Sequence, residues 1–232
     1  MKPRSERVLV PGAAGPIEVL LEFPEAAGRP PRGLALIGHP HPLYGGTLDN
    51  KVAATLARAH LALGWIAVRP NFRGVGASEG VHDDGRGETD DLLHLIEAVP
   101  RWPQWAERAL PQPAPVALAG FSFGSYVAVA AAQALQQQGR AVQSLVLVGA
   151  AAGKWPLAPV QPHTVVIHGE VDETIPLADV LAWARGSEVA VIVMPGADHF
   201  FHRRLTALKE LVMRNLLGAA RLAATDKEAS DD

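Results

Sequence analysis

The chain has 232 residues, no cysteine and a formal net charge of −3. The lack of cysteine excludes disulfides, a thiol nucleophile, thiolate zinc sites and iron–sulfur clusters. Residues 225–232 hold four acids and one lysine, which account for the whole net charge. The remainder is formally neutral and offers no basic field for nucleic acid. We expect one domain over residues 1–224, followed by a disordered acidic tail at 225–232.

No segment is typical of a secretion signal or a membrane helix. Charged residues interrupt the first ten positions, where a signal peptide needs apolar ones. The longest nearly apolar run, Leu145–Gly153, is far shorter than the ~20 residues that a membrane-spanning helix needs. We therefore expect a soluble cytoplasmic protein that binds neither membranes nor nucleic acid.

Short apolar runs alternate with longer segments of helical periodicity. The expected strands are Arg7–Val10, Ile17–Phe23, Gly33–Gly38, Trp65–Arg69, Val116–Ala119, Gln143–Val148, Thr164–His168 and Val189–Val193. The expected helices are Thr47–Leu63, Glu88–Val99 (ended by Pro100 and Pro103), Ser122–Gln138, Ala178–Arg185 and Phe200–Leu222. This alternation is typical of an α/β fold, a mainly parallel sheet with helices on both faces. In such sheets the functional residues follow the carboxyl ends of the strands.

A candidate nucleophile follows the strand Val116–Ala119. The sequence there is Gly120-Phe121-Ser122-Phe123-Gly124, and a helical pattern begins at once. Gly-x-Ser-x-Gly at a strand-to-helix turn indicates a nucleophile elbow, because larger side chains would collide with the neighbouring backbone. The alternative is a turn of small residues in which Ser122 only caps the helix.

A serine hydroxyl needs a general base. His199 lies late in the chain, in a loop before the last helix, and is the best candidate. His60 and His94 lie within expected helices and are better explained by surface or packing roles. His202 lies one turn after His199, but no third ligand completes a metal site there.

The base needs a carboxylate on its other ring nitrogen. Asp172 follows the strand Thr164–His168 and is the preferred candidate. Asp198 adjoins His199 in sequence and would hardly reach the distal nitrogen of that ring. Glu170 and Glu173 flank Asp172 and stay open as alternatives.

A developing oxyanion needs two amide donors. One is expected from Phe123, which follows the nucleophile. The other is expected from the loop His39-Pro40-His41-Pro42-Leu43-Tyr44-Gly45-Gly46. Its two prolines have no N–H, so the His41 amide is the preferred donor, with Leu43 or Tyr44 as the fallback. The side chains of His39 and His41 are expected to bond nearby carbonyls and order the loop, and a two-histidine metal site there is the weaker alternative.

The loop Arg69–Gly80 is rich in glycine. It lacks the third glycine and the directly following helix of a dinucleotide site, so a tight turn beside the site is the better interpretation. Arg73 is expected to pair with Glu88 or Asp91.

Together these motifs resemble the α/β-hydrolase superfamily, and more narrowly the small bacterial hydrolases related to dienelactone hydrolase. The matching stretches are His39-Pro40-His41-Pro42 with Gly45-Gly46, Asn71-Phe72-Arg73-Gly74-Val75-Gly76, Gly120–Gly124, His168-Gly169 with Asp172, and Asp198-His199. The resemblance implies eight strands with the second antiparallel, the order nucleophile, acid, base, and a serine hydrolase or esterase. Dienelactone hydrolase has a cysteine where this chain has Ser122, which argues against the same substrate.

The length of one connection predicts an open site. Only about 15 residues, 149–163, separate two expected strands, so a loop fits there and a helical cap does not. The expected walls of the substrate pocket are Leu43, Tyr44, Trp155 and Phe200, although Trp155 and Phe201 could equally be core residues.

The leading hypothesis is a serine esterase that acts on a small carboxylic ester without cofactor or metal. A peptidase, thioesterase or acyltransferase with the same triad is an alternative, as is a non-catalytic binding protein. A homodimer through the strand Val189–Val193 or the last helix stays open.

Overall fold

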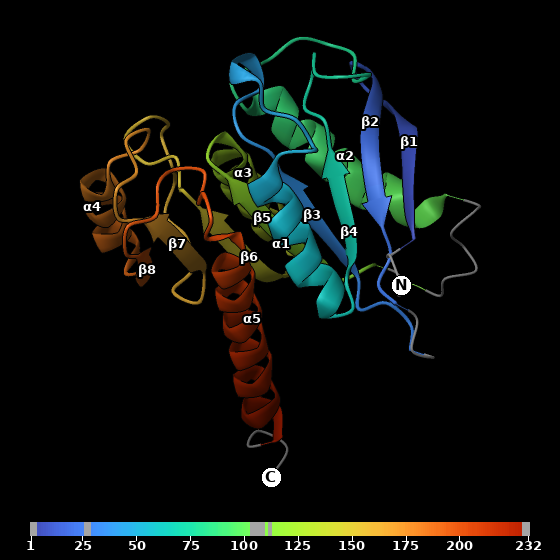
Figure 1. The fold of residues 1–232 in the computed structure, drawn as a ribbon. Coiled ribbons are helices and arrows are strands. Elements are labelled where there is room, and N and C mark those ends of the chain that lie inside the picture. Colours follow the sequence, from blue (N-terminus) through green and yellow to red (C-terminus); the bar gives the residue numbers. More distant parts are fainter. Residues whose placement is uncertain (1–3, 26–28, 103–109, 111–112, 229–232) are drawn as a thin grey trace.

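The computed structural model describes residues 4–25, 29–102, 110 and 113–228. In these residues eight strands form one sheet, in the order β1-β2-β4-β3-β5-β6-β7-β8 (Figure 1). The strands are β1 (Ser5–Gly12), β2 (Gly15–Glu22), β3 (Leu34–Gly38), β4 (Ile66–Pro70), β5 (Val116–Phe121), β6 (Val142–Val148), β7 (Val165–Gly169) and β8 (Val191–Met194). The helices are α1 (Lys51–Ala62), α2 (Arg86–Arg101), α3 (Phe123–Gln137), α4 (Leu177–Ser187) and α5 (Leu205–Glu228), with a 3₁₀ turn at Pro42–Tyr44.

The sheet has the expected topology. β2 runs antiparallel to both of its neighbours, β1 and β4, and the other pairings are parallel. The connection between β6 and β7, residues 149–164, contains no helix, so no cap domain is inserted there. The prediction of a mostly parallel eight-stranded α/β-hydrolase fold without a cap is confirmed.

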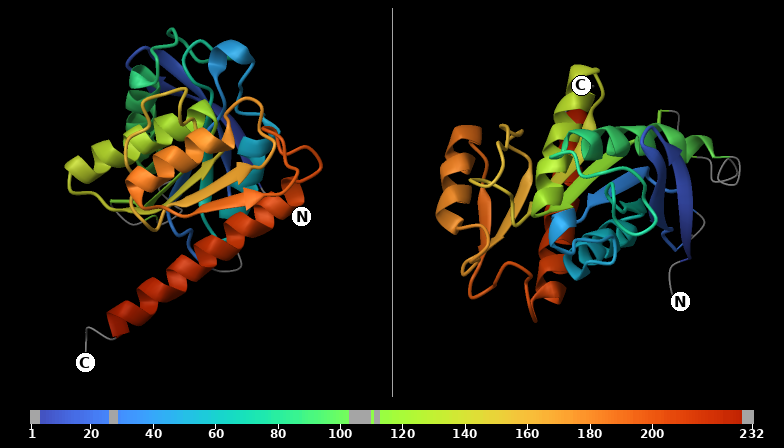
Figure 2. Two further views of the ribbon diagram at one scale, coloured as in Figure 1. Left: turned by 90° about the vertical axis from the view of Figure 1, so that its left-hand side faces the viewer. Right: turned by 90° about the horizontal axis from the view of Figure 1, so that it is seen from above.

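Helices cover both faces of the sheet and make three layers (Figure 2). α1 and α5 pack on one face through residues such as Leu56 and Val212. α2, α3 and α4 pack on the other face through residues such as Leu92, Val127 and Val180. Successive side chains of a strand point to opposite faces, which is why the central strands, apolar at nearly every position, serve both layers.

The first helix starts later than the expected Thr47. α1 begins at Lys51, because the side chain of Asn50 accepts hydrogen bonds from the amides of Val52 (2.9 Å) and Ala53 (3.2 Å). An asparagine at this position satisfies amides that have no partner within the helix. Residues 47–49, which were expected to be helical, therefore stay outside the helix.

Two other helix boundaries differ from the predictions. α5 begins at Leu205 rather than Phe200, because Phe201 and Arg203 have positive φ angles (54° and 60°) that a helix does not allow. α5 also continues to Glu228, so its backbone enters the segment 225–232 that was expected to be a disordered tail.

Pro100 does not end α2, contrary to the prediction. It lies inside the helix, which continues to Arg101. A proline in the last turn removes a single backbone hydrogen bond, so one more residue can follow in helical conformation. Pro103 lies outside the described residues.

Of the two expected partners of Arg73, Glu88 and Asp91, the structure shows Asp91. Arg73 donates two hydrogen bonds of 2.7 and 3.0 Å to this carboxylate.

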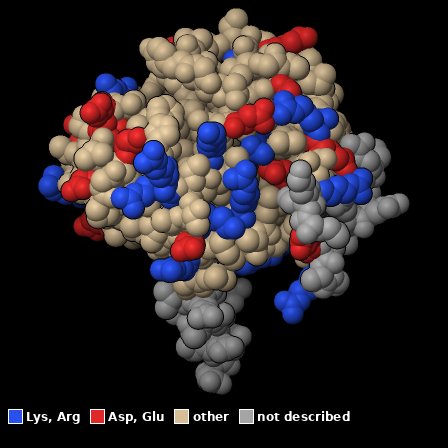
Figure 3. Space-filling view, in the orientation of Figure 1, with Lys and Arg blue, Asp and Glu red and all other residues tan. Residues whose placement is uncertain are grey.

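Surface charge is mixed in the described residues. Basic and acidic side chains are interspersed on the face that Figure 3 shows. None of the described helices combines the length and apolar character needed to span a bilayer. β8 lies at an edge of the sheet, and the homodimer stays a prediction.

Three buried histidines predict that the protein loses stability in mild acid. Burial lowers the pKa of His39 to about 4, and it also lowers the pKa values of His60 and His168 from 6.5. The unfolded chain takes up protons below pH 6.5, whereas the folded chain does not until the lower pKa. The free energy of unfolding should therefore be highest above pH 6.5 and fall towards pH 4, with about 3 kcal/mol of the fall due to His39.

Urea unfolding at pH 7, 6, 5 and 4.5 measures this dependence. His60→Gln should make the fall with pH shallower, and His163→Gln, which replaces an exposed histidine, should not. Equal stability of the wild-type protein at pH 7 and pH 5 would contradict the prediction.

Candidate active site

The turn after β5 places Ser122 in a strained conformation. Ser122 has a φ of 54°, in the region that favours glycine. A Cβ on Gly120 would lie 2.1 Å from the Gly124 carbonyl oxygen, and a Cβ on Gly124 would lie 2.3 Å from the Gly38 carbonyl oxygen. Backbone contacts on both sides therefore require the two glycines. The Ser122 side chain makes no capping hydrogen bond to α3, which contradicts the helix-cap alternative.

Gly120→Ala should destabilise the protein. The added methyl group meets backbone rather than a flexible side chain, so the strand or the elbow must move, at about 1–3 kcal/mol of the free energy of unfolding. Gly186→Ala is the matched control, because its Cβ meets no atom within 4 Å and alanine favours helix by about 0.5–1 kcal/mol. Urea denaturation measures the free energy of unfolding of both variants. Equal values for the two would refute the steric argument.

Ser122, His199 and Asp172 form a continuous chain of hydrogen bonds. His199 Nε2 lies 3.1 Å from Ser122 Oγ, and His199 Nδ1 lies 2.7 Å from Asp172 Oδ2. All three residues are buried, with 5–9% of their surface exposed. They follow β5, β8 and β7, so residues far apart in sequence meet at the carboxyl edge of the sheet.

The environment of Asp172 favours its ionised form. Its Oδ1 accepts hydrogen bonds from the amides of Thr174 (2.9 Å) and Ile175 (2.8 Å). Burial alone would raise the pKa of Asp172, but the hydrogen bond with His199, the Ile175 amide and the neighbouring imidazoles lower it below its ordinary value. His168 also faces the carboxylate, with its Nε2 3.4 Å from Oδ2. This contact was not predicted from the sequence, although His168 lies near the end of β7, the strand that Asp172 follows.

The alternative acids are engaged elsewhere or exposed. Glu170 accepts a hydrogen bond from the Gly196 amide, Glu173 is exposed, and Asp198 binds His202 at 2.6 Å. His60 and His94 contact backbone carbonyls of their surroundings. Within the described residues, no three side chains of metal-binding type come together.

The backbone amides of Phe123 and His41 have no acceptor among the described residues. Phe123 is the first residue of α3, and His41 lies in the loop after β3. The fallback amides are already used within the loop: Leu43 donates to His41 Nδ1 (3.2 Å) and Tyr44 donates to the His41 carbonyl (3.1 Å). Because β3 and β5 are neighbours, the two free amides, which follow these strands, lie at the same edge of the sheet.

An open cavity of about 460 Å³ adjoins Ser122. It is lined by His41, Tyr44, Ser122, Phe123, Ala151, Lys154, Trp155, Glu173, Thr174 and Ile175. Tyr44 and Trp155 line it as expected, whereas Leu43 does not, because its side chain is turned to solvent and 69% exposed. Phe200 instead lines a neighbouring hollow of about 360 Å³ with His199, and Phe201 is fully buried core.

Several lining residues were not predicted. They follow β6 (Ala151 and Lys154) and β7 (Glu173, Thr174 and Ile175). Their position after parallel strands could have indicated that they lie near the site. The sequence of a loop without a motif does not show which side chains point into the cavity.

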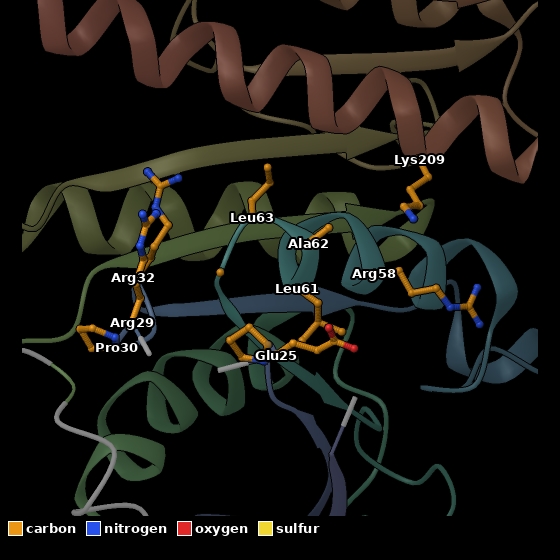
Figure 4. A pocket seen from close by; sticks show the side chains of 11 residues that line it. Glu25, Arg29, Pro30, Arg32, Arg58, Leu61, Ala62, Leu63 and Lys209 are labelled. Atoms are coloured by element: carbon orange, nitrogen blue, oxygen red, sulfur yellow. The ribbon is translucent and has the colours of Figure 1, made fainter. Parts of the chain in front are cut away.

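A larger cavity, about 720 Å³, lies at the amino ends of β3 and β4, at the opposite edge of the sheet (Figure 4). Arg29, Arg32, Arg58 and Lys209 line it together with Glu25. It contains none of the predicted site residues.

Comparison with known proteins gives concordant results. The Thioesterase domain family matches residues 105–166. An α/β serine hydrolase without lid from Xanthomonas campestris is 35% identical, with a TM-score of 0.78, and the match covers 93% of this chain and 95% of that one. An α/β serine hydrolase homologue from Coxiella burnetii is 38% identical, with a TM-score of 0.72, covering 91% and 97%.

Two weaker matches extend this result. A dienelactone hydrolase from Anabaena variabilis shares the fold, with a TM-score of 0.70, 17% identity and coverage of 94% and 99%. An uncharacterised protein of Rickettsia prowazekii is 36% identical over 103 residues, which are 44% of this chain and 40% of that protein. With the two serine hydrolases matched over nearly their whole length, the chain belongs to the lid-less α/β serine hydrolases.

Proposed function

We propose that this protein hydrolyses small carboxylic esters through an acyl intermediate on Ser122. The observation that carries the proposal is the chain of hydrogen bonds from Ser122 Oγ to His199 (3.1 Å) and from His199 to Asp172 (2.7 Å). Such a chain is the arrangement that activates a serine hydroxyl at neutral pH.

The proposed reaction has two similar halves. Ser122 Oγ attacks the acyl carbon while His199 Nε2 takes its proton, and Asp172 stabilises the resulting imidazolium. The free amides of Phe123 and His41 bind the oxyanion. His199 then gives the proton to the departing alcohol, and water releases the acyl group by the same route.

The shape of the cavity supports a small substrate. No inserted cap covers the cavity beside Ser122, and its walls carry the aromatic side chains of Tyr44, Phe123 and Trp155. An open site without a cap encloses only part of its substrate, so we expect short acyl chains to be accepted.

Thioester hydrolysis is the second candidate. It is supported by the match of the Thioesterase domain family to residues 105–166, which include Ser122. The proposed triad serves both reactions, because esters and thioesters differ in the leaving atom and not in the acyl carbon that is attacked.

Three substrates with one acyl group separate these functions. We expect turnover of 4-nitrophenyl butanoate, while the corresponding 4-nitroanilide stays intact, because an amide nitrogen must be protonated before it leaves. Faster turnover of the thiophenyl ester than of the oxygen ester would favour the thioesterase. Absence of all turnover, together with no labelling of Ser122 by a fluorophosphonate, would refute both and favour a binding protein.

A further inference from the structure

His39 is a fully buried histidine that the proposed reaction does not use directly. It stands between the end of β3 and the loop that carries His41. Its Nε2 lies 2.9 Å from the amide of Phe72, and its Nδ1 lies 2.6 Å from the carbonyl oxygen of Pro40. An amide can only donate, so Nε2 is the acceptor and the ring hydrogen is on Nδ1. His39 therefore donates to Pro40.

The surroundings keep this ring in one state. Burial lowers the pKa of His39 to about 4, so the ring stays neutral at neutral pH. The ring also packs against the buried Phe72, with the two centroids 4.3 Å apart. The hydrogen bond from the Phe72 amide and the contact with the Phe72 ring therefore fix the orientation of the imidazole, and with it the direction of its Nδ1–H.

The carbonyl that His39 binds belongs to the peptide whose N–H is the free amide of His41. In a trans peptide the carbonyl and the N–H point in opposite directions. A carbonyl held by His39 thus directs the His41 N–H to the other side of the peptide. A hydrogen bond to the carbonyl also polarises the peptide and makes its N–H a better donor.

The loop is packed tightly around this peptide. A Cβ on Gly46 would lie 2.0 Å from the Pro40 oxygen, so the chain contacts that atom from a second direction. A Cβ on Gly124 would lie 2.6 Å from the His39 carbonyl, which shows that the loop and the serine elbow touch through their backbones. The orientation of the Pro40–His41 peptide is therefore defined relative to Ser122.

We propose that His39 is a positioning residue, which sets the direction of the His41 amide as an oxyanion donor through its hydrogen bond to Pro40. The inference rests on the proposed function and assigns a role in it to a side chain that never touches substrate. A merely structural role would depend equally on the Phe72 contact.

Two substitutions separate the two hydrogen bonds of His39. The amide nitrogen of His39→Asn can replace Nδ1 and donate to Pro40, whereas the side-chain oxygen of His39→Gln can replace Nε2 and accept from Phe72. We expect His39→Gln to lower kcat for 4-nitrophenyl butanoate about 10- to 100-fold with KM changed little, since a misdirected donor costs up to about 10²–10³. His39→Asn should restore most of kcat.

The amide resonance of His41 in a ¹⁵N–¹H spectrum reports the same effect without catalysis. It should shift in His39→Gln and stay near the wild-type position in His39→Asn. If His39→Gln kept its kcat and His41 resonance, or if His39→Asn were the more damaged variant in both, the proposal would be overturned. If the wild-type protein did not turn over the ester at all, the proposed function would be contradicted. The amide resonance of His41 in the two variants would still decide the role of His39.

Gly46→Ala tests the same peptide from the other side, should neither His39 variant fold. Its methyl group must displace the Pro40 oxygen, so kcat should fall and the His41 resonance should shift while His39 is unchanged. A Gly46→Ala protein with wild-type kcat and resonance would contradict the assigned role of this peptide.

Discussion

Ser122→Ala is expected to lower kcat/KM for ester substrates by at least about 10⁴-fold, because the proposed reaction needs the hydroxyl that is hydrogen-bonded to His199 Nε2, and among the described residues that hydroxyl is Ser122 Oγ. The folded state should survive, since the Ser122 hydroxyl makes no capping bond and, within the described part of the chain, its side-chain partner is His199 alone. The measurement is ester turnover together with fluorophosphonate labelling followed by peptide mass spectrometry. Labelling should disappear with the hydroxyl.

Ser144→Ala is the matched control for this variant. The Ser144 hydroxyl is buried in β6 with no hydrogen-bond partner among the described residues, so its removal breaks no bond. Turnover and labelling should equal those of the wild-type protein. Substantial turnover by Ser122→Ala, or labelling at another residue, would disprove the assignment of the nucleophile.

Asp172→Asn should lower kcat by about 10³–10⁴-fold with little change in fold. The side-chain oxygen that binds the amides of Thr174 and Ile175 is retained, so the new amide nitrogen faces His199 Nδ1. That nitrogen favours the tautomer with its hydrogen on Nε2, which cannot accept the Ser122 proton. A pH profile of kcat for Asp172→Asn should therefore show low activity throughout the neutral range.

Asp198→Asn provides the control for this experiment, because it makes the same chemical change one residue from His199. Asp198 binds His202 on the protein surface, so we expect kcat to stay within a few-fold of the wild-type value. If Asp198→Asn lost activity while Asp172→Asn kept it, the acid would be wrongly assigned.

The alternation of strands and helices could be predicted because periodicity depends on local burial. Apolar runs such as Gly33–Gly38 are continuous because β3 is buried on both faces. Helix boundaries were less predictable. The start of α1 depends on two hydrogen bonds to the Asn50 side chain, and the start of α5 depends on the positive φ angle of Phe201. Such local competition is invisible in a pattern of apolar residues.

The sequence by itself determined the family, the sheet topology and the candidate residues, because each of these is written in motifs at strand ends. Only the tertiary structure decided between the preferred candidates and their alternatives. It brought Asp172 rather than Glu173 to His199, and it left the His41 amide free while using those of Leu43 and Tyr44 within the loop. The physical reason is that hydrogen bonding depends on distances and directions between distant segments, which sequence spacing does not specify.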